Sequence, residues 1–293
     1  MSVIAKKAKK LVRVALTPLP DKTYLSFLYR LKIGKKLNWD DPKTFNEKLQ
    51  WLKLYNRKPE YTRMVDKYEA KDYVAGIIGK EHIIPTLGVW EKFDDIDFSA
   101  LPDKFVLKCT HDSGGLVICK DKSKFDKNAA RKKINKSLRT NYYLRGREWP
   151  YKDVKPRILA EEYFVDESGD GLQDYKFFCF DGEPQFMFIA TGRANHKTCF
   201  DFFDMNFDWI PVKQHYPNAI VTPRKPKQFE KMKQLAAQLS KDFKHVRVDF
   251  FQVGDKVYFG ELTFFHFGGF ERFEPESYDY KFGEYLRLDI PRG

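Results

Sequence analysis

The sequence contains only four cysteines in 293 residues, and no two of them form a Cys-x-x-Cys pair. Cys109, Cys119, Cys179 and Cys199 are spaced too widely to indicate a zinc ribbon or a redox motif. Three of them fall in apolar, strand-like runs, where cysteine serves as a small core residue. We therefore expect reduced thiols in a cytoplasmic protein rather than a disulfide framework.

Long hydrophobic runs are also missing. No stretch approaches the roughly 18 apolar residues of a spanning helix, so an integral membrane protein is not expected. The apolar run 12–19 is interrupted by Arg13 and Pro18 and does not resemble a signal peptide. No internal repeat and no P-loop spacing occurs. A hydrophobic share of 42% is ample for a core, and the length indicates two domains or one large multi-lobed domain.

Acidic residues are nearly absent from the start of the chain. Residues 1–36 carry ten basic residues and one acid, Asp21, and so hold +9 of the net charge of +12. The rest is almost balanced, which argues against a nucleic-acid-binding face. Residues 3–16 fit a short basic amphipathic helix, and residues 1–20 could lie on an anionic membrane surface at the inner face of the membrane. A solvated, partly disordered terminus is the alternative.

The periodicity beyond the basic segment predicts an α+β protein. Helices are expected at 44–56, 61–78, 127–142 and 228–239, and strands at 105–109, 116–120, 157–164, 174–180, 185–191, 199–204, 246–253 and 256–264. Turn signals join the last two strands into a hairpin and indicate an antiparallel sheet in the second half. The predicted division is a basic segment 1–36, a helical region 37–90, a small lobe 91–157 and a large lobe 158–293.

Three groups of residues could carry chemistry. Lys108 ends a strand and is followed by a glycine turn, His111 to Gly115, which could bring backbone N–H groups to phosphate oxygens or be an ordinary β-turn. Asp174 and Lys176 share a strand face after the Glu161–Glu162 pair, and a surface ion pair would explain them equally well.

The third group lies on the final hairpin. Arg247 and Asp249 share one strand face, and Glu261 and Thr263 share the face of the paired strand. Facing carboxylates repel unless a cation lies between them, and carboxylate oxygens suit Mg²⁺. Arg247 could instead compensate the acids structurally.

These groups, in this order, resemble the ATP-grasp superfamily. Segments 38–74, 105–115, 158–164, 173–187 and 246–270 look like the TupA-like ATP-grasp family, which is named for teichuronopeptide synthesis. The resemblance covers about residues 30–285 and implies two α+β lobes that clamp ATP, preceded by a helical region.

The resemblance also implies roles for individual residues. Lys108 and Lys176 would contact ATP phosphates, with His111, Ser113, Gly114 and Gly115 in a mobile loop over them. The inter-lobe linker beside adenine and ribose would comprise Glu161, Glu162, Tyr163 and Phe164, with Asp174 close to the nucleotide. Asp249, Glu261 and Thr263 would hold Mg²⁺, although many relatives carry Asn in place of Thr263. Arg193, Arg247 and Lys176 would be catalytic, and Arg193, Arg247, His266, Gly268 and Gly269 would contact substrate.

The implied activity is an ATP- and Mg²⁺-dependent carboxylate–amine ligation through an acyl phosphate. The expected partners are an anionic sugar, such as a hexuronic acid of a capsular or other surface polysaccharide, and an amino acid or small amine. A glycosyltransferase is the alternative, since Asp95-Ile96-Asp97 matches a D-x-D string. A non-catalytic nucleotide- or glycan-binding protein is a third reading.

Overall fold

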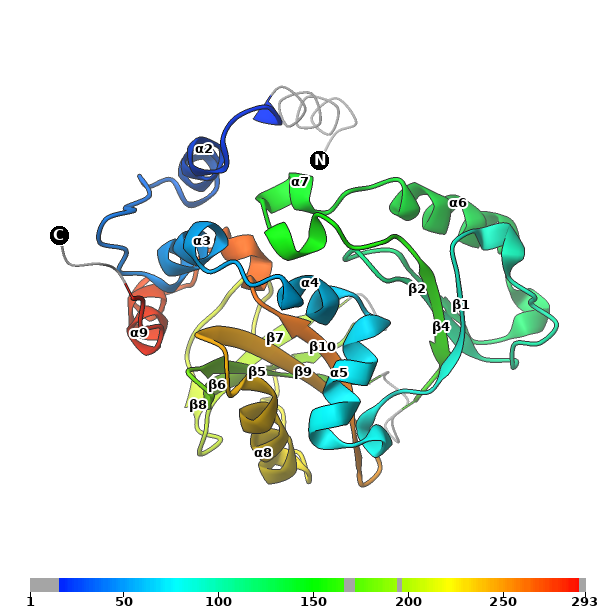
Figure 1. Ribbon diagram of the computed structural model, residues 1–293. Helices are drawn as coiled ribbons and strands as arrows, with labels where there is room; N and C mark the ends of the chain where they lie inside the picture. Colours follow the sequence, from blue (N-terminus) through cyan, green and yellow to red (C-terminus); the bar gives the residue numbers. More distant parts are fainter. Residues whose placement is uncertain (1–15, 166–171, 194–196, 290–293) are drawn as a thin grey trace.

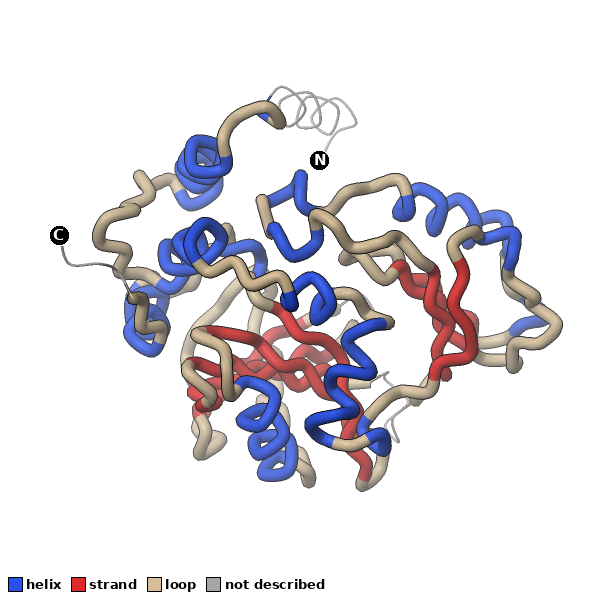
Figure 2. Tube along the Cα trace, viewed as in Figure 1, coloured by secondary structure: helices blue, strands red, loops and turns tan. Residues whose placement is uncertain are grey.

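The computed structural model describes residues 16–165, 172–193 and 197–289. The helix predicted at 3–16 lies outside these residues except for its last position. Two antiparallel sheets form the framework, and most helices surround the larger one (Figures 1 and 2). Within the described residues, no helix is long and apolar enough to cross a membrane.

The smaller sheet has the strand order β1-β4-β2-β3. Its strands are β1 (Thr86–Trp90), β2 (Phe105–Cys109), β3 (Leu116–Cys119) and β4 (Ile158–Glu162). Helix α6 (Lys127–Leu138) covers one face, where Ile134 packs with Phe105 and Leu107 in a core of its own. The sheet therefore runs from Thr86 to Glu162, so the lobe boundary lies after β4 and β1 belongs to the small lobe, unlike the predicted division at 90/91 and 157/158.

The larger sheet has the order β10-β9-β5-β6-β7-β8. Its strands are β5 (Asp174–Phe180), β6 (Glu183–Thr191), β7 (Cys199–Asp204), β8 (Trp209–Ile210), β9 (His245–Val253) and β10 (Lys256–Thr263). Every residue of β5 is buried because both sheet faces are covered. Phe177 contacts Phe229 of α8 (Phe229–Ser240) on one face, and Phe178 contacts Phe45 on the other.

The remaining helical elements are short. They are α2 (Asp21–Ile33), α3 (Phe45–Tyr55), α4 (Glu60–Val65), α5 (Glu69–Ile78), α7 (Tyr143–Gly146), α9 (Ser277–Tyr285) and the 3₁₀ turns η1 (Lys80–His82), η2 (Phe93–Asp95), η3 (Lys122–Lys124), η4 (Trp149–Tyr151) and η5 (His266–Gly269). Of these, η2 packs in the core of the smaller sheet, where Phe93 lies in the same cluster as Phe105. Thr44 and Glu47 form a capping box that fixes the start of α3. Helix α2 lies within the segment that we treated only as a basic tail.

The single helix predicted at 61–78 is wrong, because it breaks into α4 and α5. Asp66 adopts an extended conformation, and its Oδ1 accepts hydrogen bonds from the backbone N–H groups of Tyr68 and Glu69. Its carboxylate thus caps the start of α5. The backbone N–H of Lys67 makes no helical hydrogen bond and instead donates to the carbonyl oxygen of Thr110, directly after β2 (3.1 Å). The break therefore ties the helical region to the small lobe beside the glycine turn.

Candidate active site

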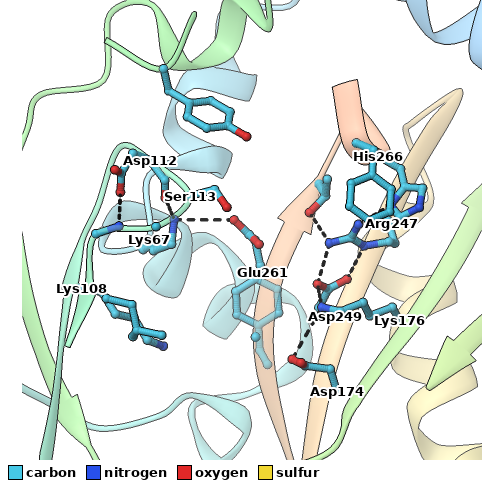
Figure 3. Close-up of a pocket in the computed structure, with 18 of the residues that line it drawn as sticks. Lys67, Lys108, Asp112, Ser113, Asp174, Lys176, Arg247, Asp249, Glu261 and His266 are labelled. Carbon is cyan, nitrogen blue, oxygen red and sulfur yellow. Dashed lines mark hydrogen bonds and ion pairs between the residues drawn. The ribbon is translucent and has the colours of Figure 1, made fainter. Parts of the chain in front are cut away.

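A cavity of about 420 Å³ lies between the two sheets and is lined by residues from both (Figure 3). It brings together most of the predicted site residues: Lys108, Ser113, Gly114, Gly115, Glu161, Asp174, Lys176, Arg193, Arg247, Asp249, Glu261, Thr263, His266 and Gly268. Residues separated by about 150 positions in the chain thus meet in one place.

Five predicted residues do not line this cavity. His111 is buried, and its Nε2 lies 3.2 Å from Ser137 O of α6. Glu162 is exposed, Tyr163 is half-buried, and Phe164 packs on Tyr258. A Cβ at Gly269 would lie 2.4 Å from Gln50 Nε2, so this glycine serves close packing against α3.

Two lysines share one carboxylate on the small-lobe side of the cavity. Glu161 Oε1 lies 2.5 Å from Lys71 Nζ and Glu161 Oε2 lies 2.5 Å from Lys108 Nζ. Burial opposes ionisation of Glu161, but the two ammonium groups outweigh burial and hold its pKa below the ordinary value. Burial also lowers the pKa of Lys71, and Glu161 offsets part of that shift. The two lysines and the shared carboxylate together keep a net charge of +1 on this wall of the cavity.

The glycine turn is anchored at its base and open at its tip. Asp112 is buried and accepts hydrogen bonds from Ser137 Oγ and from the backbone N–H of Gly115. A Cβ at Gly115 would lie 2.5 Å from Ser137 Oγ, so only glycine fits there. A Cβ at Gly114 would meet no atom within 4 Å. This geometry leaves Ser113 and Gly114 free to approach a ligand.

A chain of charged groups crosses the large-lobe side of the cavity (Figure 3). Arg247 binds Asp249 through both carboxylate oxygens, at 2.7 and 2.8 Å. Lys176 bridges Asp249 and Asp174, and Arg193 NH1 lies 2.5 Å from the second oxygen of Asp174. Burial would raise the pKa of Asp249, but Arg247 and Lys176 hold it below its ordinary value. Asp174 thus orients two predicted catalytic cations.

Glu261 lies directly opposite Asp249 in the β9–β10 ladder, where the register shifts at Gly260. Such a bulge re-aims the following side chain. Lys67 Nζ lies 3.6 Å from Glu261 Oε1 and donates a hydrogen bond to Asp112 O at 2.6 Å. Lys67 therefore connects the glycine turn to Glu261, a predicted Mg²⁺ ligand. Thr263 Oγ1 accepts from Arg247 NH2 at 3.0 Å. The hydroxyl that we assigned to a metal ion therefore orients Arg247 in this structure.

His266 is buried behind Arg247. Its Nδ1 lies 2.6 Å from Arg247 NH1 and its Nε2 lies 2.8 Å from Gln214 Oε1. Gly268 follows with a positive φ of 62°, in η5. His266 thus lines the cavity as a support for Arg247.

The residues present fit a magnesium ion. Asp249 and Glu261 supply carboxylate oxygens from paired strands, and Mg²⁺ is commonly held by one or two carboxylates together with substrate phosphates. Among the described residues, no three His, Cys, Asp or Glu side chains gather closely enough to hold a metal by themselves. A bound ion would accordingly need water or phosphate oxygens as its remaining ligands.

Lys67, Lys71 and Glu148 also line the cavity, although the sequence pattern did not indicate them as site residues. The two lysines lie in the segment that we read as one helix, and Glu148 follows α7. The D-x-D string is not part of the site: Asp97 Oδ1 accepts from the N–H and the hydroxyl of Ser99, and neither of its aspartates lines the cavity.

Two antiparallel sheets that face each other across a charged cleft, beside packed helices, define a two-lobed α+β protein. A family model for TupA-like ATP-grasp proteins matches residues 47–287, and the chain belongs to this family. The predicted family and ATP-grasp fold are therefore confirmed.

The chain is also similar to solved structures. D-Alanine–D-alanine ligase from Helicobacter pylori shares 14% identity (TM-score 0.48) over 86% of this chain and 68% of that one. The Bacillus anthracis enzyme complexed with ATP shares 15% (TM-score 0.40) over 68% and 53%, so this chain spans about half its length. D-Cycloserine synthetase DcsG shares 14% (TM-score 0.41) over 77% and 71%. No curated protein sequence matches the chain.

Proposed function

We propose that the protein is an ATP- and Mg²⁺-dependent carboxylate–amine ligase. One arrangement carries this proposal: Lys108 and Lys176 come from different sheets to one cavity, with Asp249 and Glu261 paired between them. Cations on both walls suit a triphosphate, and the carboxylate pair suits the divalent ion that accompanies it. Membership of the ATP-grasp family supports the same reading.

In the proposed reaction, a substrate carboxylate oxygen attacks the γ-phosphorus of ATP and releases ADP. The resulting acyl phosphate is attacked by an amine, which forms the amide and releases phosphate. A magnesium ion at Asp249 and Glu261 would neutralise phosphate charge during the first step. Arg247 is held rigidly: four of its five N–H groups meet Asp249, Thr263 and His266, which leaves one at NH1 for a substrate oxygen.

We propose a hexuronic acid of a surface polysaccharide, or a precursor of one, as the carboxylate substrate. Tyr216 and Phe267 line the same cavity and remain 37% and 36% exposed. Flat aromatic faces suit the apolar face of a pyranose ring, and Arg193 and Arg247 would pair with its carboxylate. The family is named for teichuronopeptide synthesis, which favours the same class of substrate.

The test is a screen of D-glucuronic and D-galacturonic acid, free and as nucleotide sugars, against amino acids and small amines. ADP release would be followed by a coupled assay and amide products by mass spectrometry. We expect ADP release that requires both substrates and an amide product of matching mass. Nucleotide binding without ADP release for any pair would overturn the proposal, and sugar transfer without ATP would favour a glycosyltransferase.

A further inference from the structure

Glu148 differs from the other acidic side chains of the cavity. It lies between α7 and η4, is only 7% exposed and lines the cavity. Glu161, Asp174 and Asp249 each have at least one cation within 4 Å. Among residues 16–165, 172–193 and 197–289, no hydrogen bond or ion pair within 4 Å engages the carboxylate of Glu148. Such a buried, unpartnered acid is costly and calls for a physical explanation.

Lys53, a buried cation that interacts electrostatically with Glu148, does not provide that partner. Lys53 is fully buried, and its Nζ donates to Gln50 Oε1 (3.0 Å), Gly146 O (2.7 Å) and Gly268 O (2.6 Å). An ammonium group has three hydrogens, and these acceptors use all of them. Lys53 therefore binds the carbonyl groups of Gly146 and Gly268 and leaves the Glu148 carboxylate without a hydrogen bond.

Glu148 lines the cavity together with Gly268. Its Oε1 would lie 3.5 Å from a Cβ at Gly146 and 3.3 Å from a Cβ at Gly268. Two positions next to the carboxylate thus carry no side chain. Burial raises the pKa of Glu148, and Glu261 adds to this shift while Lys53 opposes it. Nothing described in the protein supplies the hydrogen-bonding cation that would stabilise the ionised form.

We propose that Glu148 binds the ammonium group of the amine substrate and accepts its proton. The inference rests on the proposed ligase function and specifies its second substrate as a cationic amine. One N–H proton of the ammonium passes to the Glu148 carboxylate, and the freed lone pair forms the C–N bond to the acyl carbon. The C–O bond to phosphate breaks, and phosphate leaves with that electron pair. The second N–H proton that is lost leaves with the phosphate as HPO₄²⁻.

This assignment accounts for the position of Glu148 in the cleft. It shares the cavity with Arg247 and Glu261, which we place at the acyl phosphate, but it comes from a different segment of the chain. An ammonium group bound in the cavity would supply the missing donor. Amine binding and nucleotide binding therefore use different residues and can be separated by mutation.

The binding test compares the full-length wild type with Glu148→Gln, Glu148→Asp and Glu284→Gln. Glu284 is an exposed acid of α9 and serves as the matched control. Calorimetric titrations at pH 8 with Mg²⁺ and ADP present would use methylamine, ethanolamine, glycine, L-alanine, L-glutamate and L-lysine. We expect at least one amine to bind the wild type and Glu284→Gln alike, and to bind Glu148→Gln at least tenfold more weakly. Equal affinity in Glu148→Gln, or binding of no amine to the wild type, would overturn the proposal.

A second measurement separates this inference from the ligase function itself. Hydroxylamine traps acyl phosphates chemically, so hydroxamate formation from ATP and a hexuronic acid reports carboxylate activation alone. Glu148→Gln should retain hydroxamate formation within twofold and lose amide formation at least 100-fold, with partial recovery in Glu148→Asp. Loss of both reactions together in a folded Glu148→Gln protein would contradict an amine-specific role. Absence of hydroxamate in the wild type would contradict the ligase proposal, while the amine titration still decides the role of Glu148.

Discussion

Arg247 and His266 are joined by a 2.6 Å hydrogen bond in which NH1 of the guanidinium donates to Nδ1 of the imidazole. Since Nδ1 accepts, the ring proton lies on Nε2, which donates to Gln214 Oε1. Burial holds the pKa of His266 well below its ordinary value, and Arg247 adds to this shift. A neutral imidazole thus supports one edge of the guanidinium, and Asp249 supports the other.

This geometry predicts different outcomes for two substitutions of His266. In His266→Asn the side-chain carbonyl can reach the position of Nδ1 and accept from Arg247, whereas the longer side chain of His266→Gln places its polar group nearer to Gln214. We expect kcat for ADP release to fall less than tenfold in His266→Asn and about 100-fold in His266→Gln, on the scale of one lost transition-state contact. KM for ATP should change little in both. The reverse order would show that His266 acts on Gln214 rather than on Arg247.

Glu261→Gln tests the metal site. The substitution keeps the shape of the side chain and removes the charge that we assign to Mg²⁺ binding, so turnover should fall at least 100-fold. The ion pair with Lys67 is 3.6 Å long and partly exposed, so the unfolding free energy should change by no more than about 1 kcal/mol. ADP release and urea denaturation, with Glu284→Gln as control, provide the measurements. Retained activity would mean that the metal binds elsewhere.

Glu161→Gln should destabilise the fold and increase the stabilisation that ATP binding gives to the protein. Removing the shared carboxylate leaves the buried Lys71 and the half-buried Lys108 without their partner, at a cost of about 3 kcal/mol. ATP phosphates would then supply the missing negative charge. We expect the melting temperature to fall, and ATP to raise it by more in the variant than in the wild type. An ATP-induced shift smaller than that of the wild type would show that Glu161 itself contacts the nucleotide.

Lys67→Met tests whether Lys67 restrains the glycine turn. The lysine donates to Asp112 O, and its removal frees one side of the loop that carries Ser113 and Gly114. Amide hydrogen exchange in residues 110–116 should become faster in the ligand-free protein. Lys132→Met is the control, since Lys132 is exposed on α6. Unchanged exchange at 110–116 would place the restraint entirely at Ser137.

The buried His245 predicts a specific loss of stability in acid. Burial lowers the pKa of His245 to about 3, and its Nδ1 donates to Cys179 O. The unfolded chain binds a proton near pH 6.5 and the folded one does not, so stability is full above pH 6.5 and declines as the pH falls. Between pH 7 and pH 5 this group removes about 2 kcal/mol.

His245→Phe keeps the ring contacts with Phe45 and Phe180 but cannot titrate. The difference in unfolding free energy between pH 7 and pH 5 should therefore be about 2 kcal/mol smaller than in the wild type. Urea denaturation at both pH values measures this difference. An identical pH dependence in the two proteins would show that His245 becomes protonated without unfolding.

The bounds of a strand could be predicted from the sequence where the apolar periodicity and the turn residues indicate the same strand ends. The strand at 105–109 and the strands at 174–180 and 199–204 are found with the predicted bounds. The order of charged residues indicated the ATP-grasp superfamily, and five longer segments indicated the TupA-like family, which is confirmed. Most of these charged residues line one cavity. Strand alternation also placed Asp249 and Glu261 correctly on facing positions.

The missed features depend on contacts between distant segments. The break after α4 needs a carboxylate cap at Asp66 and a hydrogen bond from Lys67 to Thr110, and neither alters the apolar pattern of 61–78. Glu148 gave no signal because a single acid in a short loop is ordinarily exposed. Thr263 matched a metal-ligand position in sequence, but the proximity of Arg247 gives its hydroxyl a different partner.

The segment that contains α7 and η4 leaves the small lobe and packs against the large lobe, and this limits how the cleft can close. Between α6 and β4, the chain returns to the helices of the large lobe, where Trp149 stacks on Tyr61 and Lys53 binds Gly146 O. The small lobe is thus connected to the rest of the protein at both of its chain ends and also through α7 and η4, so it does not turn about a single hinge. A rotation of the whole small lobe would disrupt the contacts of Trp149 and Gly146. Movement of the loop tip at Ser113 and Gly114 leaves these contacts intact and therefore costs less free energy. The two substrates would then meet in a cleft in which the distance between the two sheets stays constant and only the glycine turn moves.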